Sequence, residues 1–265
     1  MLILEGIKAY QELGLNGASA SSAFSQDLIL RGISKSPYFK NITVKGGVAM
    51  RNFTKDIRRA TLDLDLDFIN YSISEESIKA LIESLCTEEF HFSITGKIEE
   101  LKQQDYHGKR VHIKIADTTN YSISTKIDIG VHTYSDIAQN QVIVDFLPKK
   151  ENFTILSNSK EQIFVEKAKA LLRLGQFSTR YKDIFDLFWL KDVVNKEILR
   201  HYFDTLIFKD EGMEEKILQD ARIRFEKIFA NKNFKQKILS SDKNWVKEDV
   251  GKVTGDILQF MKNLE

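Results

Sequence analysis

Three aspartates, Asp63, Asp65 and Asp67, stand at alternate positions of the leucine-rich run LDLDLD. Alternate residues of a β-strand share one face and lie about 6 to 7 Å apart, so neighbouring carboxylates can bind a shared divalent cation. Aspartate is also unfavourable in strands, which suggests that something uses these side chains. The alternative is the solvated polar face of an amphipathic strand. The spacing therefore predicts either a metal-binding carboxylate pair or a charged surface.

A glycine pair upstream, Gly46 and Gly47 in KGGVAM, favours the metal-binding alternative. Glycine lets the backbone approach a ligand closely, and the free N–H groups at the start of a following helix attract an anion. A phosphate cradle beside paired carboxylates is the arrangement of metal-assisted phosphoryl or nucleotidyl transfer. A third acid from a neighbouring strand often completes such a site, and Asp128 in STKIDIGV is the candidate. Its alternative is an exposed acid on an edge strand.

Charged residues of the C-terminal half lie among apolar neighbours. At 100° per residue, Lys167 falls within the apolar stripe of EQIFVEKAKALLRLG, and Asp183 shares a face with two leucines in the next helix. Asp186 is also partly surrounded by apolar residues. One interpretation is a structural ion pair of Asp183 with Arg180 or Lys167, or a lysine that extends along its helix to water. The other, which we favour, is that Lys167 and Asp183 line a cleft facing the aspartate strand.

Hydrophobic periodicity predicts the elements that position these residues. The aspartates fall on a half-buried strand from Arg59 to Ile69, and a helix capped by Ser74 follows it. An earlier helix is expected to begin at Ser22 or Ser25. From about residue 160 the periodicity is helical, so we predict an α+β fold with a mixed-sheet domain over residues 1–150 and a helical bundle over 151–265. The predicted strands are 39–44, 59–69, 90–98, 109–117 and 122–132, with turns over 104–109 and 118–121.

Composition excludes several classes of protein. Lys plus Arg total 39 against 38 for Asp plus Glu in 265 residues, a net charge of +1, so no overall basic field attracts nucleic acid. Cys86 is the single cysteine, and no stretch approaches the roughly 18 apolar residues that span a bilayer. Because the opening residues also lack a signal-peptide pattern, we expect a cytoplasmic protein with no membrane partner. A basic run over 232–247, with Phe234 and Trp245, is either an RNA contact or, as we favour, a solvated helical face.

These pieces, in order over residues 39–191, resemble the AbiEii/AbiGii nucleotidyltransferase toxin family, the toxin half of bacterial type IV toxin–antitoxin and abortive-infection systems. KGGVAM is similar to the family's GG-x-A-L turn, RRATLDLDLD to its R-x-[ST]-x-D-x-D motif, and KIDIG to its third-strand acid. EQIFVEKAKALLR and TRYKDIFDLFWL resemble the paired E-K and R-x-x-D-x-x-D-L segments. Val48 differs, because many members have Thr there, and a hydroxyl contact to phosphate is lost.

The resemblance implies a nucleotidyltransferase-like first domain and an enzyme that uses an NTP with Mg²⁺, for which Mn²⁺ can substitute. It assigns the metal to Asp63, Asp65 and Asp128, leaves Asp67 as a supporting acid, and adds Lys167 and Asp183 as catalytic residues of the helical half. The residues that it assigns to nucleotide binding are Lys45, Gly46, Gly47, Arg59, Thr61 and Lys167.

The resemblance also implies partners. The acceptor is a hydroxyl at the 3′ end of tRNA, and a cognate antitoxin represses transcription and acts mainly without a stable complex. Two rival functions stay open: a nucleotidyltransferase that modifies a small molecule such as an antibiotic, and a non-catalytic interaction protein that keeps the fold. Intact Asp63, Asp65, Asp128 and Lys167 argue against the second rival, because an idle site is free to lose clustered charges.

Overall fold

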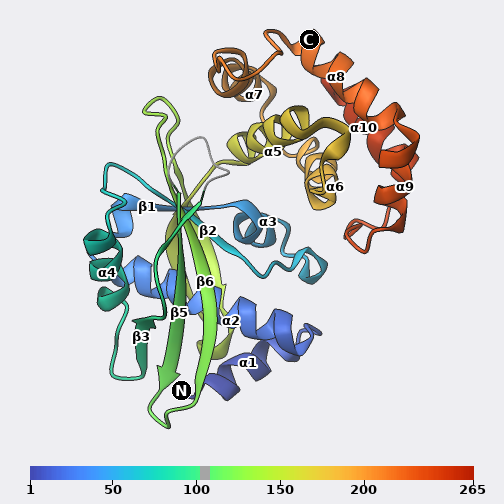
Figure 1. Cartoon of the computed structure of the whole chain (residues 1–265). Coiled ribbons are helices and arrows are strands. Elements are labelled where there is room, and N and C mark those ends of the chain that lie inside the picture. Colours follow the sequence, from blue (N-terminus) through green and yellow to red (C-terminus); the bar gives the residue numbers. More distant parts are fainter. Residues whose placement is uncertain (102–107) are drawn as a thin grey trace. The chain divides into compact units, whose positions relative to one another are not determined.

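The computed structural model describes residues 1–101 and 108–265, so most of the turn expected over 104–109 lies outside the described residues. The chain divides into two compact units, Met1–Asn158 and Ser159–Glu265. The first unit combines a mixed sheet with helices and the second is helical, which confirms the predicted α+β class (Figure 1). The boundary expected after residue 150 lies before the last strand of the first unit.

Within the described residues, the first unit is built on one eight-stranded sheet. Its strands are β1 (Ile42–Lys45), β2 (Leu64–Phe68), β3 (Phe90–Ile94), β4 (Glu99–Leu101), β5 (Gly108–Asp117), β6 (Ser122–Val131), β7 (Asn140–Phe146) and β8 (Glu151–Ser157). The strand order is β3-β5-β6-β2-β1-β8-β7, with β4 paired to β5. Because β1 runs parallel to β8 and β2 parallel to β6, whereas the other pairs are antiparallel, the sheet is mixed. The aspartate strand β2 lies in its interior.

Strand β2 is shorter than the predicted strand 59–69. Arg59 belongs to a 3₁₀ turn, and Leu62, which a strand over 59–69 would bury on the same face as Leu64, is 56% exposed. The reason lies in a distant side chain: buried Gln26 donates from Nε2 to the carbonyl oxygens of Thr61 (3.1 Å) and Asp63 (3.3 Å). A side chain thus satisfies backbone that a neighbouring strand would otherwise pair.

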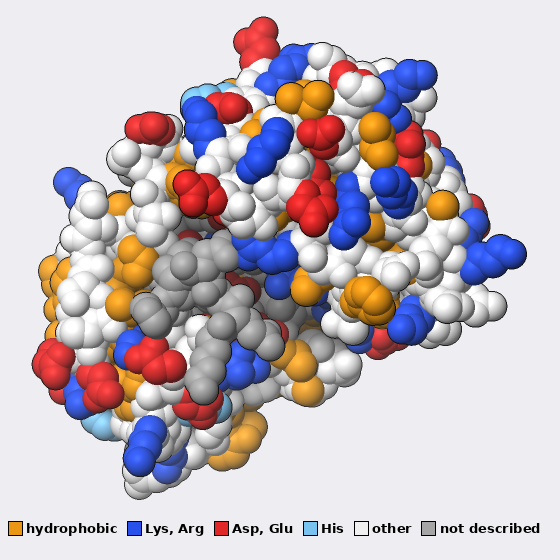
Figure 2. Space-filling model, turned by 45° about the horizontal axis from the view of Figure 1, so that its top comes forward, with side chains coloured by type: hydrophobic (Ala, Val, Ile, Leu, Met, Phe, Trp, Pro, Cys, Tyr) orange, Lys and Arg blue, Asp and Glu red, His pale blue; other side chains and the backbone are white. Residues whose placement is uncertain are grey.

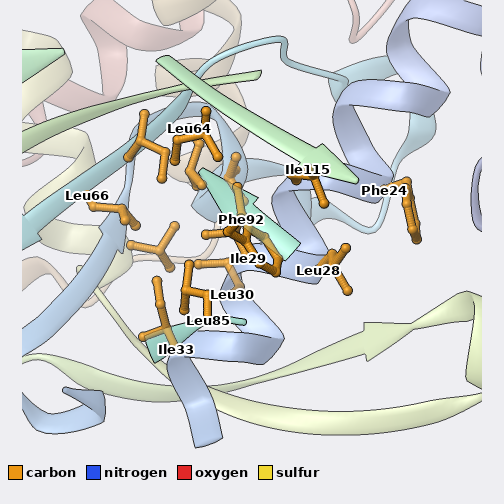
Figure 3. Packing of buried hydrophobic residues seen from close by; sticks show 14 of the residues in the cluster. Phe24, Leu28, Ile29, Leu30, Ile33, Leu64, Leu66, Leu85, Phe92 and Ile115 are labelled. Carbon is orange, nitrogen blue, oxygen red and sulfur yellow. The ribbon is translucent and has the colours of Figure 1, made fainter. Parts of the chain in front are cut away.

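Four helices accompany the sheet in the described part of the first unit. They are α1 (Ile3–Gln11), α2 (Gly17–Lys35), α3 (Gly46–Thr54) and α4 (Glu75–Ser84). The core forms where the apolar side of β2, with Leu64 and Leu66, meets α2 residues such as Ile29 (Figure 3). The start predicted for α2 was wrong, because Asn16 caps it by accepting from the Ser19 N–H. The Ser74 cap of α4 is confirmed.

Strand β8 was missed because its polar first residues, Glu151 and Asn152, hide the alternation that follows. Phe153 and Ile155 are buried on one face, and β8 pairs with both β1 and β7. Its parallel register places Leu156 opposite Thr43. The first unit therefore extends to the end of this strand.

The second unit confirms the predicted helical bundle. Its buried residues include Phe164, Phe185, Phe203 and Phe225, which supply a core of its own. A π-helical segment, Asp204–Phe208, follows the third of its helices. The helices are α5 (Lys160–Leu174), α6 (Tyr181–Leu190), α7 (Lys196–Phe203), α8 (Leu218–Ala230), α9 (Lys232–Ser240) and α10 (Val250–Lys262).

Charged side chains of both signs are interspersed over the face drawn in Figure 2, in keeping with the net charge of +1. Hydrophobic side chains also reach this face in small groups. Among the helices in the described ranges, none has the length and apolar character that crossing a membrane requires.

Candidate active site

The register of four strands gathers the candidate residues of the first unit in one row across the sheet. Asp65 lies opposite Lys45 of β1 and opposite Asp128 of β6, and Asp128 lies opposite Arg110 of β5. Directly paired residues project to the same face of a sheet. The row Lys45–Asp65–Asp128–Arg110 therefore lines the face opposite to Leu64 and the core. The third acid that the sequence predicted is thus brought beside the aspartate strand.

Along β2 the three aspartates differ in exposure. The Asp63 side chain is 49% exposed, whereas Asp67 is buried beneath its ion pair with Lys45, in which Nζ and Oδ1 are 2.6 Å apart. Asp65 is intermediate. Asp63 and Asp65 are consequently the carboxylates that a ligand from solvent can reach, and Asp67 is placed for a supporting role.

The glycine pair is required by its neighbours. Gly46 has φ +61°, in the left-handed region, and a Cβ there would collide with the carboxylate of Asp65. A Cβ on Gly47 would lie 2.6 Å from the Thr61 hydroxyl oxygen. Both residues open helix α3, whose first backbone N–H groups lack carbonyl partners within the helix and present a positive dipole end. The pair thus lets the start of a helix lie directly against a carboxylate, and we call this junction of Gly46, Gly47 and Asp65 the cradle.

Two further residues that the resemblance assigned to the nucleotide lie before β2, and one of them, Thr61, adjoins this cradle. Thr61 faces Gly47 through its hydroxyl, and its backbone is held by Gln26. Arg59 is buried at the end of a 3₁₀ turn, so it contributes to the loop before β2. Sequence reasoning missed Gln26, because a glutamine in a helix gives no local signal of a bond to residues far along the chain.

The carboxylates of this face have cationic partners, which sequence reasoning also missed. Lys126 pairs with Asp63 (2.8 Å), and Arg110 forms two bonds of 2.7 Å, from Nε and Nη2, to the oxygens of Asp128. The paired Asp128 raises the pKa of Arg110 above its ordinary value. Both cations come from strands whose period-two pattern was recognised. The cross-strand register that turns their side chains toward the aspartates could not be read from that pattern.

The carboxylates of Asp63 and Asp65 are the type of ligand that a magnesium ion prefers. Mg²⁺ prefers oxygen ligands and in nucleotide sites commonly takes one or two carboxylates together with substrate phosphates and water. The cradle beside Asp65 would receive those phosphates. Among the described residues, no group of three or more His, Cys, Asp or Glu side chains is arranged for a metal ion, and Asp128 is held by Arg110. The third metal ligand that the resemblance implied is therefore directed toward an arginine in this structure.

A second cluster of buried charges lies in the second unit, on α5 and α6. The Lys167 Nζ is 2.5 Å from Asp183 Oδ1 and 2.8 Å from Asp186 Oδ2, and Arg180 Nε donates to Asp183 Oδ2 at 2.6 Å. Lys167 is 5% exposed and Asp183 6%. Burial raises the pKa of Asp183, but the charges of Lys167 and Arg180 outweigh it and lower that pKa to about 2. Lys167 is thus the ion-pair partner of both aspartates.

Trp245 completes this cluster and decides between the two interpretations of the basic run 232–247. Its indole N–H donates to Asp186 Oδ1 at 3.0 Å, and its side chain is buried. Phe234 is buried as well. Neither aromatic residue of the basic run 232–247 therefore offers a ring to stack on an RNA base. Lys232, Lys235 and Lys237 of this run are exposed, in agreement with the favoured interpretation of a solvated helical face. Asp186, whose role was undefined, binds Lys167 and the indole at once.

Comparisons with known proteins agree with this picture. No curated protein matches the chain in sequence. A crystal structure of an antigenic nucleotidyltransferase-like protein from Paracoccidioides brasiliensis shares the fold: the similarity covers 83% of this chain and 94% of that chain, with a TM-score of 0.51 and 13% identity. Residues 28–258 match the family described as "Nucleotidyl transferase AbiEii toxin, Type IV TA system". Because that match includes most of both units, the chain belongs to the AbiEii nucleotidyltransferase toxin family of type IV toxin–antitoxin systems.

Proposed function

We propose that the chain transfers a nucleoside monophosphate from an NTP to a hydroxyl of RNA, at the 3′ end of tRNA. The acceptor oxygen forms a bond to the α-phosphorus, and the bond from that phosphorus to the oxygen bridging to the β-phosphate breaks. Pyrophosphate leaves with the electron pair, and the acceptor proton passes to a carboxylate. Membership of the family supports nucleotidyl transfer, and the acceptor is part of the proposal.

The observation that carries this proposal is the contact between the glycine pair and the aspartate strand. The Asp65 carboxylate packs so closely against Gly46 that a Cβ there would overlap it, so the start of α3 and the aspartate strand adjoin each other and one ligand can contact both. The N–H groups that open α3 suit phosphate oxygens, and Lys45 adds a positive charge one residue before them. An anion and a carboxylate-bound cation are the two ligands that such a cradle accommodates together.

Each residue of the row then has a role. Asp63 and Asp65 would hold Mg²⁺, or Mn²⁺ in its place, which supplies charge neutralisation to the phosphates when bound. Gly46, Gly47 and Lys45 bind the triphosphate. Asp128 would receive the acceptor proton, for which one of its two oxygens must exchange its bond from Arg110 for one from the acceptor hydroxyl.

Lys167 and Asp183 enter the proposal through the family motif rather than through a ligand contact. Their buried ion pair supports a structural contribution to the second unit at the least. We propose that both are needed for transfer, and the variant described in the Discussion separates a direct role from a structural one.

Radiolabelled nucleotides test the proposal. The purified protein, Mg²⁺ and total RNA are incubated with each NTP labelled at either the α- or the γ-phosphate, and the RNA is separated from small molecules. We expect label from the α-phosphate alone to enter the tRNA fraction, and the Asp65→Asn variant to transfer none. Label from the α-phosphate in a new small-molecule product, resolved from the unreacted NTP after a small-molecule cell extract is added, would replace RNA by a small-molecule acceptor. Absence of transfer and of NTP binding would leave a non-catalytic interaction protein.

The antitoxin proposal has its own test. Family membership implies an antitoxin, and we propose that it acts by repressing transcription, with no stable complex with this chain. Co-purification of a tagged chain with its candidate antitoxin tests for a stable complex, and a reporter under the promoter of the antitoxin gene tests for repression. Recovery of the two proteins in a fixed ratio would contradict it.

A further inference from the structure

A cavity of about 370 Å³ lies in the first unit, at one end of the sheet face that carries Asp65, Asp67 and Asp128 and that we call the acidic face. Ile69, which follows the last residue of β2 and lies two residues after Asp67, lines this cavity. Leu156 also lines it, and both Leu156 and Asp67 lie opposite Thr43 of β1. His132 follows β6 at the position opposite Ile69, because its N–H bonds to the Phe68 carbonyl. Side chains two residues apart share a face, so the cavity continues the face that carries the aspartates.

The walls of this cavity combine flat apolar surface with a few polar groups. Tyr134 and His132 stand edge to face, with ring centroids 6.4 Å apart, beside Ile69 and Leu156. Such walls, together with a small number of fixed polar groups, are typical of small-molecule sites. A planar aromatic ligand would find both stacking surface and hydrogen-bonding partners here.

The polar groups are themselves held in place. The Gln139 Nε2 lies 3.2 Å from the Ile137 carbonyl oxygen, to which it donates, and Oε1 accepts from the Thr43 hydroxyl at 2.8 Å. Thr43 is fully buried in the row that contains Asp67. The amide is therefore fixed by the same strand, β1, that leads into the glycine cradle.

The charge of the lining residues and the distance from Asp65 to the cavity restrict the class of ligand further. None of the lining residues is acidic and one, Lys40, is basic, which favours a ligand that carries phosphate near its apolar part. From Asp65 to Ile69 the strand advances four residues, about 13 Å at 3.3 Å per residue. Asp67 lies between Asp65 and Ile69, opposite Thr43 and in its ion pair with Lys45. A ligand with phosphate at the cradle and a ring in the cavity would lie across these residues.

We propose that this cavity binds a nucleoside, with its base between the Tyr134 and Ile69 walls. Two sources have this chemistry: the NTP itself and the terminal nucleoside of an RNA acceptor. The inference rests on the proposed function, because it gives the phosphate-binding cradle a neighbouring subsite for the base of one substrate.

The test fills the cavity without disturbing the strands. Ala138 is exposed and lines the cavity, so Ala138→Trp occupies it, whereas Asp136→Trp places the same ring on the same loop outside the lining. Affinities for a non-hydrolysable NTP and for inorganic tripolyphosphate are measured by calorimetry with Mg²⁺, and the KM for total tRNA in the transfer assay. Tyr134→Ala removes a wall instead, and Tyr121→Ala, an exposed tyrosine at a distant turn, is its control.

We expect all variants to bind tripolyphosphate as the parent does. If the NTP supplies the nucleoside, Ala138→Trp and Tyr134→Ala lose at least tenfold in NTP affinity. If the acceptor supplies it, NTP affinity is kept and the KM for tRNA rises at least tenfold. Parent-like values for both quantities in both variants would overturn the nucleoside subsite. A parent protein that binds neither tripolyphosphate nor NTP would instead overturn the proposed function, and the subsite with it.

Discussion

Removal of the Lys167 ammonium is the most informative single change in the second unit. Lys167→Ala leaves Asp183 and Asp186 buried without the cation that joins them. Breaking a buried ion pair by deleting one partner typically costs about 3 to 5 kcal/mol. Because Arg180 still bonds to Asp183 and the Trp245 indole still donates to Asp186, we expect the lower end, about 3 kcal/mol of unfolding free energy.

The chain offers both a probe and a control for this change. Its two tryptophans, Trp189 and Trp245, belong to the second unit, so urea denaturation followed by tryptophan fluorescence at pH 7 reports the unfolding of that unit. Arg173 lies on the same helix as Lys167 and pairs with Asp210 at 3.4 Å near solvent. Arg173→Ala should cost no more than about 1 kcal/mol, as exposed ion pairs do.

The result decides between the two interpretations of Lys167. A loss below 1 kcal/mol, equal to that of Arg173→Ala, would refute the structural reasoning and favour a lysine that is free to turn to a ligand. A large loss with parent-like tripolyphosphate affinity, measured in the absence of urea where the variant is folded, would remove Lys167 from the phosphate-binding residues. A large loss of both would show that stability and binding depend on the same ammonium.

Three further predictions follow from the distances and pKa values. Because the pKa of Asp183 is lowered, its ionised carboxylate stabilises the fold by roughly 2 kcal/mol above its ordinary pKa, and this stabilisation is lost as the pH falls toward 2. Urea denaturation should therefore show a difference in unfolding free energy between the parent and Asp183→Asn that shrinks below pH 4. Asp63→Asn should abolish α-phosphate transfer and change the unfolding free energy by less than about 1 kcal/mol, because its ion pair is half exposed; a larger loss would mark a structural residue. Gly46→Ala should weaken tripolyphosphate binding at least tenfold by collision with Asp65, whereas Gly96→Ala, with a similar φ and no atom within 4 Å, should leave it unchanged; equal effects would contradict the cradle.

The sequence predicted the fold class and the polar face of β2 because both depend on local periodicity. It could not predict the residue at which that strand begins, since Gln26 of a distant helix binds the backbone before Leu64. The cationic partners Arg110 and Lys126 were missed for a related reason: their pairing depends on cross-strand register. Helical spacing left the ion pair of Lys167 with Asp183 as one of two interpretations, and not the favoured one, because the two residues lie on different helices whose packing is not local; the burial of Trp245 against Asp186 likewise required the tertiary structure.

The ion pairs of the acidic face have a thermodynamic consequence for substrate binding. A divalent cation that arrives alone must take Asp63 from Lys126, and the ammonium loses this ion pair. A polyphosphate that arrives alone must take Lys45 from buried Asp67 at a similar disadvantage. When both ligands bind, the negative phosphates can compensate the displaced Lys126, and the divalent cation can compensate the displaced Asp67. Metal and nucleotide should therefore raise each other's affinity by the same factor, as linkage requires, and the free protein should hold either of them only weakly.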